Sequence, residues 1–326
     1  MSRKEGSSSE AFAIRAVGLT KRYGDKLAVD RFQLDVPRGQ FFGLLGPNGA
    51  GKTTAVHMLS TLIRPTSGEA WVAGNSVLKA PLSVRGAIGV VFQDSALDRN
   101  LTVAENLRFA GMLNHMPRSL IRARSVELLE LFGLAETSER QVALLSGGMC
   151  RALDIARGLM HHPQVLFLDE PTIGLDLPNR RAIWRHIAML RAELRTTVIL
   201  TTHYLEEAAE CDRVGFINAG RLVREGVPRE LIGELGEYIV EIEAPQPQLL
   251  AQALFARLGG STIEDNVVSF RFDGNARILA DLHADLAPQV RAMRWRSPNL
   301  NDVFLWVLRA EHGRSSPASE ATRMNK

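Results

Sequence analysis

The spacing of apolar and polar residues changes along the chain, and each change predicts a different kind of element. The segment RFQLDV, residues 31–36, alternates between the two classes, as in a strand with one face in solvent. Three other segments are apolar without alternation, as in strands buried on both faces: FFGLLG at 41–46, QVLFLDE at 164–170 and TTVILTTH at 196–203. Helical stretches such as PNRRAIWRHIAMLRAEL, with Pro178 at its start, lie between them. This order predicts an α/β fold built on a mainly parallel sheet.

The stretch from about 94 to 160 lacks a clear strand pattern. TVAENLRFAGML begins with Thr102 and Glu105 at the spacing of a capping box, and SLIRARSVELLELFGL follows as a second amphipathic helix. We therefore expect a helical insert between two strands of the sheet.

The pattern changes again near residue 236. Five segments indicate, in order, a strand, a helix, a hairpin, a helix and a strand: EYIVEIEA, PQLLAQALFARLGG, TIEDNVVSFRFD, ARILADLHADLAP and VRAMRW. This order resembles a ferredoxin-like β-α-β-β-α-β unit, and NDVFLWVLRAE predicts a closing helix. The expected organisation is a disordered N-terminus (1–11), a large domain (12–232) with its insert (94–160), a small α+β domain (236–310) and a disordered tail (311–326).

Composition and charge narrow the class of protein. The 326 residues are 45% hydrophobic and 23% charged, which is typical of a folded globular protein. A net charge of +3, from 39 basic and 36 acidic residues, is too near balance to indicate a nucleic-acid partner. No apolar run approaches the roughly 20 residues of a membrane-spanning helix. Cys150 and Cys211 lack metal-ligand spacing, so we expect two buried thiols in a reducing, cytosolic compartment.

The segment GPNGAGKTT fits the pattern G-x-x-x-x-G-K-[ST] and lies between a buried strand and a helical stretch, the context that this motif requires. Its glycines allow backbone N–H groups to face phosphate oxygens. Lys52 is expected to reach the β- and γ-phosphates, and the Thr53 hydroxyl to ligate Mg²⁺. The motif predicts a bound nucleoside triphosphate, in contact with Gly46, Pro47, Asn48, Gly49, Ala50, Gly51, Lys52, Thr53 and Thr54.

A second part of the site is predicted at the end of QVLFLDE. This strand delivers Asp169 and Glu170 to the sheet edge at which ligands bind in open α/β folds. Asp169 is the expected Mg²⁺ partner, through water. Glu170 is one residue further, points elsewhere and can polarise an attacking water as a general base. The alternative is a pair of solvated carboxylates at a strand end.

The segment LLSGGMC, residues 144–150, predicts a second anion site. Ser146, Gly147 and Gly148 stand directly before RALDIARGLM, which has helical spacing. Backbone N–H groups are therefore exposed at the positive end of a helix dipole. A single bound nucleotide leaves this second cradle unexplained.

Together these motifs resemble the ATPase subunit of an ATP-binding cassette (ABC) transporter, over about residues 12–232. The resemblance implies a P-loop fold with a mixed sheet, an antiparallel β subdomain and a helical insert. Tyr23, in LTKRYGDK, matches an aromatic residue that stacks on adenine. Gln93, in VVFQDS, matches a glutamine that senses the γ-phosphate and Mg²⁺. Asp176, in IGLD, matches the loop that connects subunits, and His203 matches the histidine that holds the γ-phosphate and orients water.

The resemblance also explains the second cradle. LSGGM matches the signature sequence of the family, with Met149 where glutamine is commonest and Cys150 in a place that is often polar or basic. In that family two copies pack head to tail, and each signature caps the ATP bound by the P-loop of the other copy. The implied assembly is an ATP-dependent homodimer with two equivalent sites, each using ATP and Mg²⁺.

Three segments are similar to bacterial exporter ATPases of the daunorubicin-resistance and nodulation-factor types: LDRNLTVAENL, THYLEEAAECDRV and SPNLNDVFLWV. The resemblance implies an ATPase that drives a separate permease for export of a drug, lipid or oligosaccharide. Such a protein is peripheral at the cytoplasmic face of the inner membrane, and the permease would contact Asp94–Gly111. Two alternatives stay open: a soluble cassette ATPase acting on ribosomes or nucleic acid, and a P-loop kinase, which would leave the signature unexplained.

Overall fold

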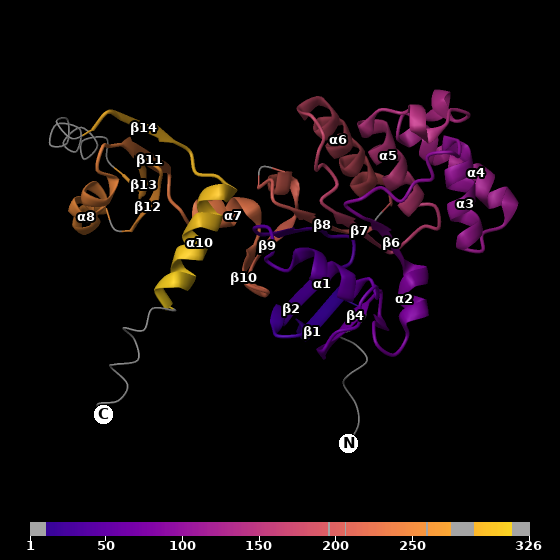
Figure 1. Cartoon of the computed structure of the whole chain (residues 1–326), viewed down its shortest axis with the longest axis horizontal. Helices are drawn as coiled ribbons and strands as arrows, with labels where there is room; N and C mark the ends of the chain where they lie inside the picture. The colour runs from indigo at the N-terminus through magenta and orange to yellow at the C-terminus, as the bar shows by residue number, and fades with distance from the viewer. Residues whose placement is uncertain (1–10, 195, 206, 259, 275–289, 315–326) are drawn as a thin grey trace, which may run out of the picture. The chain divides into compact units, whose positions relative to one another are not determined.

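The computed structural model describes residues 11–194, 196–205, 207–258, 260–274 and 290–314. Within these ranges the chain forms two compact units, whose elements are labelled in Figure 1. The first takes in the described residues up to His203 together with Cys211–Glu225, and the second takes Tyr204–Glu210 and the described residues from Gly226 onward. The predicted disordered N-terminus lies outside the described residues except for its last position. No described helix is both long and apolar enough to cross a bilayer.

The first unit alternates strands and helices along most of its length. Its strands are β1 (Phe12–Tyr23), β2 (Lys26–Pro37), β3 (Phe41–Leu45), β4 (Ser67–Val72), β5 (Asn75–Ser76), β6 (Ile88–Val91), β7 (Val165–Asp169), β8 (Thr197–Thr202), β9 (Arg213–Asn218) and β10 (Arg221–Gly226). Its helices are α1 (Lys52–Leu59), α2 (Pro81–Ala87), α3 (Val103–Leu113), α4 (Arg118–Leu131), α5 (Gly147–Gly158) and α6 (Leu177–Leu194), with short 3-10 turns at Ala135–Thr137 and Val142–Leu144.

A mainly parallel sheet forms the centre of this unit, with the strand order β10-β9-β3-β8-β7-β6 among the described residues. β3 pairs in parallel with β8 and β9, and β7 pairs in parallel with β6 and β8. Every residue of β3, β7 and β8 is buried, which confirms the prediction for strands covered on both faces. These strands therefore bring their carboxyl ends to one edge of the sheet, beside the loops that follow them.

A second sheet of this unit is antiparallel, in the order β2-β1-β4-β5. Phe32, Leu34 and Val36 of β2 are buried and their neighbours are exposed, which confirms the predicted alternation. One hydrophobic core includes residues of both sheets, such as Phe32 and Phe167. The two sheets therefore pack as layers of a single unit.

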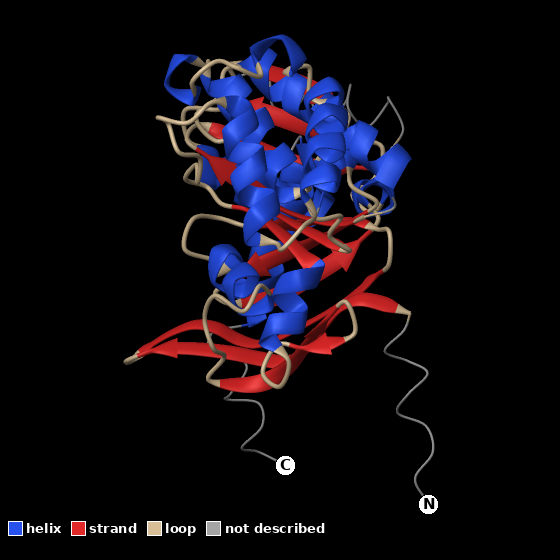
Figure 2. Ribbon diagram, turned by 90° about the vertical axis from the view of Figure 1, so that its right-hand side faces the viewer, coloured by secondary structure: helices blue, strands red, loops and turns tan. Residues whose placement is uncertain are grey.

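The helical insert lies between β6 and β7, as predicted, and consists of α3, α4 and α5. The Thr102 hydroxyl accepts from the N–H of Glu105 at 3.2 Å, and the Glu105 carboxylate accepts from the N–H of Thr102 at 2.8 Å, so the predicted capping box is present. Apart from an isolated bridge between Thr102 and Gln141, the described insert has no β pairing. In Figure 2, which is seen from the right-hand side of Figure 1, these helices face the viewer.

The second unit has an antiparallel sheet in the order β12-β13-β11-β14 among its described residues. Its strands are β11 (Tyr238–Glu243), β12 (Ser261–Glu264), β13 (Val267–Phe272) and β14 (Ala292–Arg296), and its helices are α7 (Pro228–Gly233), α8 (Pro247–Leu258) and α10 (Leu300–Arg314), with a 3-10 turn at Glu207–Glu210. β11 and β12 are consecutive in the chain, but β13 lies between them in the sheet. In the same way β13 and β14 are consecutive, and β11 lies between them. This order agrees with the predicted ferredoxin-like unit. Its second predicted helix, at 276–288, lies outside the described residues.

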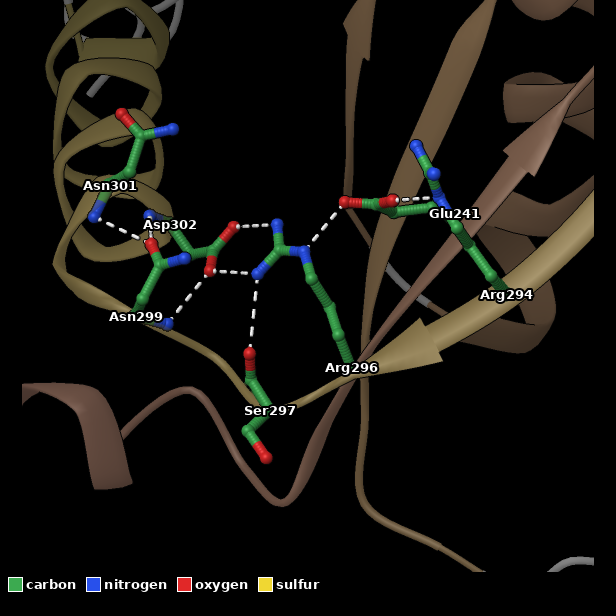
Figure 3. Close-up of polar contacts among 7 residues, drawn as sticks. All are labelled: Glu241, Arg294, Arg296, Ser297, Asn299, Asn301 and Asp302. Carbon is green, nitrogen blue, oxygen red and sulfur yellow. Dashed lines mark hydrogen bonds and ion pairs between the residues drawn. The ribbon is translucent and has the colours of Figure 1, made fainter.

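An ion-pair network joins the sheet of this unit to α10 (Figure 3). Arg296, at the end of β14, donates to the two carboxylate oxygens of Asp302 at 2.7 and 2.8 Å, and its Nε donates to Glu241 on β11 at 2.7 Å. Glu241 also accepts from Arg294 at 2.7 Å. Asp302 lies in the first turn of α10 and accepts from the N–H of Asn299 at 2.9 Å. The network therefore ties the start of α10 to the sheet.

Two predicted boundaries differ from the structure. Residues 226–232 were expected in the large domain, but they belong to the second unit, where α7 packs against α10 and buries Leu231. The predicted disordered tail begins at 311, yet the helical backbone of α10 continues to Arg314. Both differences arise because packing and backbone hydrogen bonding, rather than local polarity, decide where a unit or a helix ends.

Candidate active site

The glycine-rich loop joins β3 to α1 and has close backbone neighbours at two glycines. A Cβ on Gly46 would lie 2.3 Å from the carbonyl oxygen of Ile217, and a Cβ on Gly51 would lie 2.6 Å from that of Ala28. Gly51 also has a φ of 106°, a left-handed conformation that other residues rarely adopt. It caps α1, which begins at Lys52. The first N–H groups of α1 lack intrahelical acceptors and can bind an anion.

The Lys52 side chain lies across this loop, and the residue is only 5% exposed. Its Nζ donates to the carbonyl oxygens of Gly46 at 2.8 Å and Pro47 at 3.2 Å, and it lies 3.5 Å from Oε1 of Glu170. A buried ammonium group needs such acceptors to offset its lost hydration. Phosphate oxygens are stronger hydrogen-bond acceptors than carbonyl oxygens. The Lys52 ammonium can therefore leave its carbonyl acceptors and bond the phosphates of a nucleotide.

Asp169 ends β7 and is 2% exposed. Its Oδ1 accepts from the Thr53 hydroxyl at 3.4 Å and also from the Thr201 hydroxyl. A hydroxyl and a carboxylate this close together are the hard oxygen ligands that Mg²⁺ prefers. Within the described residues, no group of three His, Cys, Asp or Glu side chains is suited to a metal. Mg²⁺ at this place would therefore take its other ligands from phosphate and water.

Glu170 follows in a left-handed conformation, with a φ of 47°. Its N–H donates to the carbonyl oxygen of Thr201 at 3.1 Å and to the Thr201 hydroxyl at 3.0 Å. Its carboxylate lies 3.3 Å from Nδ1 of His203 and 3.5 Å from Nζ of Lys52. The strained peptide is therefore held by β8, and the carboxylate stands between two nitrogen groups at the edge of the sheet.

Part of the glycine-rich loop, Lys52, Thr53 and Glu170 border a pocket of about 390 Å³. Its wall consists of Tyr23, Lys26, Ala28, Asn48, Gly49, Gly51, Lys52, Thr53, Thr54, Gln93, Glu170 and Ile173. Tyr23 is 49% exposed, and the Lys21 ammonium lies 5.0 Å from the centre of its ring. Gln93 is exposed and follows the end of β6. The pocket brings an aromatic ring, a glycine-rich loop, an amide and a carboxylate together from distant segments.

The predicted site residues that do not line this pocket wall are Gly46, Pro47, Ala50, Asp169 and His203, together with the signature and Asp176. Ser146 caps α5 by accepting a backbone hydrogen bond at 3.3 Å, and both Ser146 and Gly147 are exposed. A Cβ on Gly148 would lie 2.2 Å from Oδ1 of Asn179, so the packing of α6 requires glycine there. Asp176 is exposed and caps α6 by accepting from the N–H of Asn179 at 3.1 Å. Both segments face solvent rather than the pocket of their own chain.

Sequence reasoning missed two residues that hold this site. Thr201 bonds both the carboxylate of Asp169 and the backbone of Glu170. Arg151, in α5, donates to backbone carbonyl oxygens around the end of β7 and beside Gln93. The available signals were the threonines at the carboxyl end of β8 and a basic residue shortly after the signature glycines.

The two cysteines differ from each other in burial. Cys211 is 5% exposed, as predicted, but Cys150 is only half-buried, so the expectation of two buried thiols is wrong for it. The Sγ of Cys150 lies 3.8 Å from the carbonyl oxygen of Val142. Burial raises the pKa of the Cys150 thiol above its ordinary value. The thiol is therefore protonated and a weak nucleophile at neutral pH.

Comparisons with known sequences agree with this geometry. Residues 29–173 match the family described as ABC transporter. The chain is 41% identical over 301 residues to the Daunorubicin resistance ATP-binding protein DrrA3 of Streptomyces coeruleorubidus, which covers 90% of this chain and 95% of that protein. It is 40% identical over 287 residues to the Nod factor export ATP-binding protein I of Cupriavidus metallidurans, which covers 87% of this chain and 93% of that protein.

Solved structures share the fold. A dimeric ATP-binding cassette in a post-hydrolysis state, bound to ADP and Pi, matches with a TM-score of 0.60 and 27% identity, over 66% of this chain and 98% of that chain. The cbiO1 protein of Clostridium perfringens, part of an ABC transporter complex, matches with a TM-score of 0.64 and 27% identity, over 76% of this chain and 96% of that chain. The predicted P-loop cassette fold is therefore confirmed. The chain belongs to the ABC transporter family, as one of its ATP-binding and ATP-hydrolysing members.

Proposed function

We propose that this protein is the motor subunit of a bacterial exporter, in which hydrolysis of ATP drives transport by a separate membrane permease. The observation that carries the proposal is the environment of Glu170, whose carboxylate lies beside Lys52 and His203 at the pocket. A protein that only bound nucleotide would need the loop and Asp169. It would have little use for a second carboxylate in this position.

Binding uses the loop and the residues around it. A nucleotide base stacks on the half-exposed ring of Tyr23, which lines the pocket. The N–H groups of the loop and the Lys52 ammonium bind the phosphates. Thr53, Gln93 and Asp169 would hold Mg²⁺, and the ion would supply positive charge that neutralises the phosphates.

Hydrolysis uses the groups at the end of the parallel sheet. Glu170 acts as the general base that accepts a proton from the attacking water. His203 holds the γ-phosphate and orients that water, and its Nδ1 is 3.3 Å from the Glu170 carboxylate, so the two groups can act on the same water. Gln93, which also lines the pocket, senses whether the γ-phosphate is present.

The exposed signature supports an ATP-dependent homodimer. Ser146 and Gly147 stand at the start of α5 and face solvent, where they can cap the nucleotide of a second copy. Asp176 is exposed at the start of α6. It lies near the signature because Gly148 of α5 packs against Asn179 of α6. A head-to-tail pair would then contain two equivalent composite sites.

A groove between α3 and α4 supports the permease partner. It has a volume of about 540 Å³, and its wall includes Ala104, Arg108, Met112 and Val126. Met112 and Val126 are 46% and 52% exposed, so the groove offers apolar side chains with basic neighbours. One wall belongs to the predicted contact surface Asp94–Gly111. This lining fits a short amphipathic helix of a membrane protein.

The proposed place of the protein is the cytoplasmic face of the bacterial inner membrane, where it is held by the permease. The two relatives named above concern daunorubicin resistance and Nod factor export. Their names support a drug, lipid or oligosaccharide as the exported molecule. The test is co-purification with a multi-span membrane protein that alters the ATPase rate. Salt-dependent retention on nucleic acid, without a membrane partner, would instead favour the soluble alternative.

The catalytic and dimer assignments are tested together on Glu170→Gln protein. We expect ATP binding to persist and hydrolysis to slow by about 100-fold or more, because the base is lost. Light scattering should show the mass of a monomer without nucleotide and of a dimer with ATP and Mg²⁺. A Ser146→Arg control should bind ATP and remain a monomer. Near-normal turnover of Glu170→Gln would contradict the general-base role, and a constant mass would contradict ATP-dependent pairing.

A further inference from the structure

Arg151 is a buried cation whose bonds differ from those of an ordinary ion pair. It lies in α5, shortly after the signature, and is 7% exposed. Its Nε donates to the carbonyl oxygen of Pro171 at 2.6 Å, and its Nη1 donates to that of Phe92 at 2.6 Å. Its Nη2 donates to the carbonyl oxygens of Asp169 at 3.2 Å and Glu170 at 3.1 Å. The described contacts of the guanidinium are therefore with backbone oxygens.

The acceptors of Arg151 belong to two functional segments. Three of them are consecutive residues at the end of β7, and Phe92 directly precedes Gln93. Only a planar fork with several donors can bind such a set at once, because a lysine offers a single nitrogen. The side chain therefore joins α5 to the peptide that carries the proposed general base and to the segment that carries the glutamine.

The Glu170 peptide is held from both sides. Its N–H is bonded to Thr201 on β8, and its carbonyl oxygen is bonded to Arg151 on α5. Because its φ of 47° is strained, this backbone conformation persists only where its surroundings hold it. A change in the position of α5 would act directly on that peptide.

The surroundings of Arg151 act on the charge of its guanidinium in two opposing ways. Burial lowers the pKa of the Arg151 guanidinium, and the carboxylates of Asp154 and Asp169 oppose that shift. An arginine remains protonated at any physiological pH. The bonds to the carbonyl oxygens are therefore charge-assisted throughout the working range.

We infer that Arg151 is a positioning residue that links the signature helix to the catalytic carboxylate of its own chain. When the signature engages the nucleotide of a second copy, the link carries the position of α5 to Glu170 and Gln93. This inference rests on the proposed function, since it needs both a catalytic Glu170 and a signature that contacts another copy. It adds a route by which one composite site of the dimer influences the other.

The first test is the split between ATP binding and turnover in Arg151→Lys protein. Arg151 does not border the pocket, so we expect ATP affinity within about threefold of the wild type, while kcat falls by about tenfold or more as the fork is lost. The matched control is Arg140→Gln, which removes another guanidinium–carbonyl bond, from Arg140 to Leu144 at 3.2 Å, on the exposed side of the same insert. This control should keep the wild-type kcat.

The second test asks whether Arg151 acts through Glu170. Single-turnover hydrolysis of labelled ATP is compared for Arg151→Lys, Glu170→Gln and the double variant. If Arg151 works by placing the carboxylate, the double variant should be no more than about threefold slower than Glu170→Gln alone. A general structural role would multiply the two losses. The double variant should also still form a dimer with ATP, because Ser146 and Gly147 are unchanged.

The outcomes separate this inference from the proposed function. If Glu170→Gln alone keeps normal turnover, the proposed function fails. If Glu170→Gln behaves as expected, the inference is overturned by any of three results: a wild-type kcat in Arg151→Lys, a parallel loss of ATP affinity and folding, or multiplied losses in the double variant. A normal affinity, a lower kcat and non-multiplied losses support it.

Discussion

Two arginine-centred networks, one in each unit, use the same side chain in different ways. Arg151 is almost fully buried and bonds backbone carbonyl oxygens at the end of β7 and before Gln93. Arg296 is partly exposed and bonds the carboxylates of Glu241 and Asp302. Backbone carbonyls do not titrate, whereas carboxylates do. The first network is therefore independent of pH over the working range, and the second loses its acceptors in acid.

The comparison separates activity from stability. The groups around Arg151 meet the pocket, so damage there should change turnover before it changes folding. The groups around Arg296 join α10 to the sheet of the second unit, so damage there should change unfolding of that unit and leave the chemistry of the pocket intact. Each variant below is measured for both properties, and the comparison fails if the two properties change together.

The largest effect is expected for Lys52→Ala. The phosphates lose their fixed cation, and Glu170 loses its closest ammonium neighbour at 3.5 Å, so turnover should fall by about 1,000-fold or more. ATPase assays and fluorescent-nucleotide binding measure this loss. The unfolding of the second unit should not change. Unchanged turnover would contradict the assignment of the glycine-rich loop as the phosphate-binding site.

A smaller loss of activity is expected for Thr201→Val. The hydroxyl that bonds Asp169 and the N–H of Glu170 is replaced by a methyl group of the same shape, and turnover should fall by about tenfold. Thr201→Ser is the matched control, because it keeps the hydroxyl and should keep most of the rate. If valine and serine reduced the rate equally, packing rather than hydrogen bonding would explain the effect.

Asp302→Asn should act on stability alone. Arg296 then bonds a neutral amide instead of a carboxylate, and the second unit should lose about 1–3 kcal/mol of unfolding free energy, because Asp302 is buried. Urea unfolding followed by the fluorescence of Trp295 and Trp306 measures this change. Arg291→Gln, which breaks an exposed pair at 3.9 Å, is the control and should cost below about 0.5 kcal/mol. A parallel loss of ATPase activity would contradict the separation of the two networks.

The smallest effect is the acid sensitivity contributed by Glu241. Burial alone would raise the pKa of Glu241, but hydrogen bonds from Arg296 and Arg294 outweigh it, so the pKa lies below the ordinary value of 4.5. The folded state therefore holds this proton less tightly than the unfolded state. The stabilisation is present above pH 4.5 and is lost as the pH falls through the lowered pKa. Glu241→Gln should make unfolding of the second unit less dependent on pH below 4.5; an unchanged pH profile would assign the acid sensitivity to other carboxylates.

Much of the fold could be predicted because its signals are local. The continuous apolar runs of β3, β7 and β8 predicted strands buried on both faces, and all three are so. Thr102 and Glu105 predicted a helix start, and their reciprocal hydrogen bonds are present. The strand order of the second unit likewise agrees with the predicted sequence of elements. In each case residues close in the chain carry the whole signal.

The pocket was also predictable in its main parts. Lys52, Thr53, Gln93 and Glu170 all border one space, because the carboxyl ends of neighbouring parallel strands meet at one edge of the sheet. The signature and Asp176 do not border it, which agrees with their expected use by a second copy. The role of the signature remains a prediction that Ser146→Arg tests, and the role of Asp176 remains a prediction.

By itself, the sequence determined the buried strands, the helix caps and the loop that can hold phosphate, since periodicity and glycine placement act over a few neighbouring residues. Only the tertiary structure decided that Thr201 and Arg151 hold Glu170 and that α7 belongs to the second unit. The physical reason is that the decisive partners are backbone oxygens and packing surfaces from distant segments. A backbone carbonyl has the same chemistry in every residue, so the sequence does not mark which one an arginine will bind.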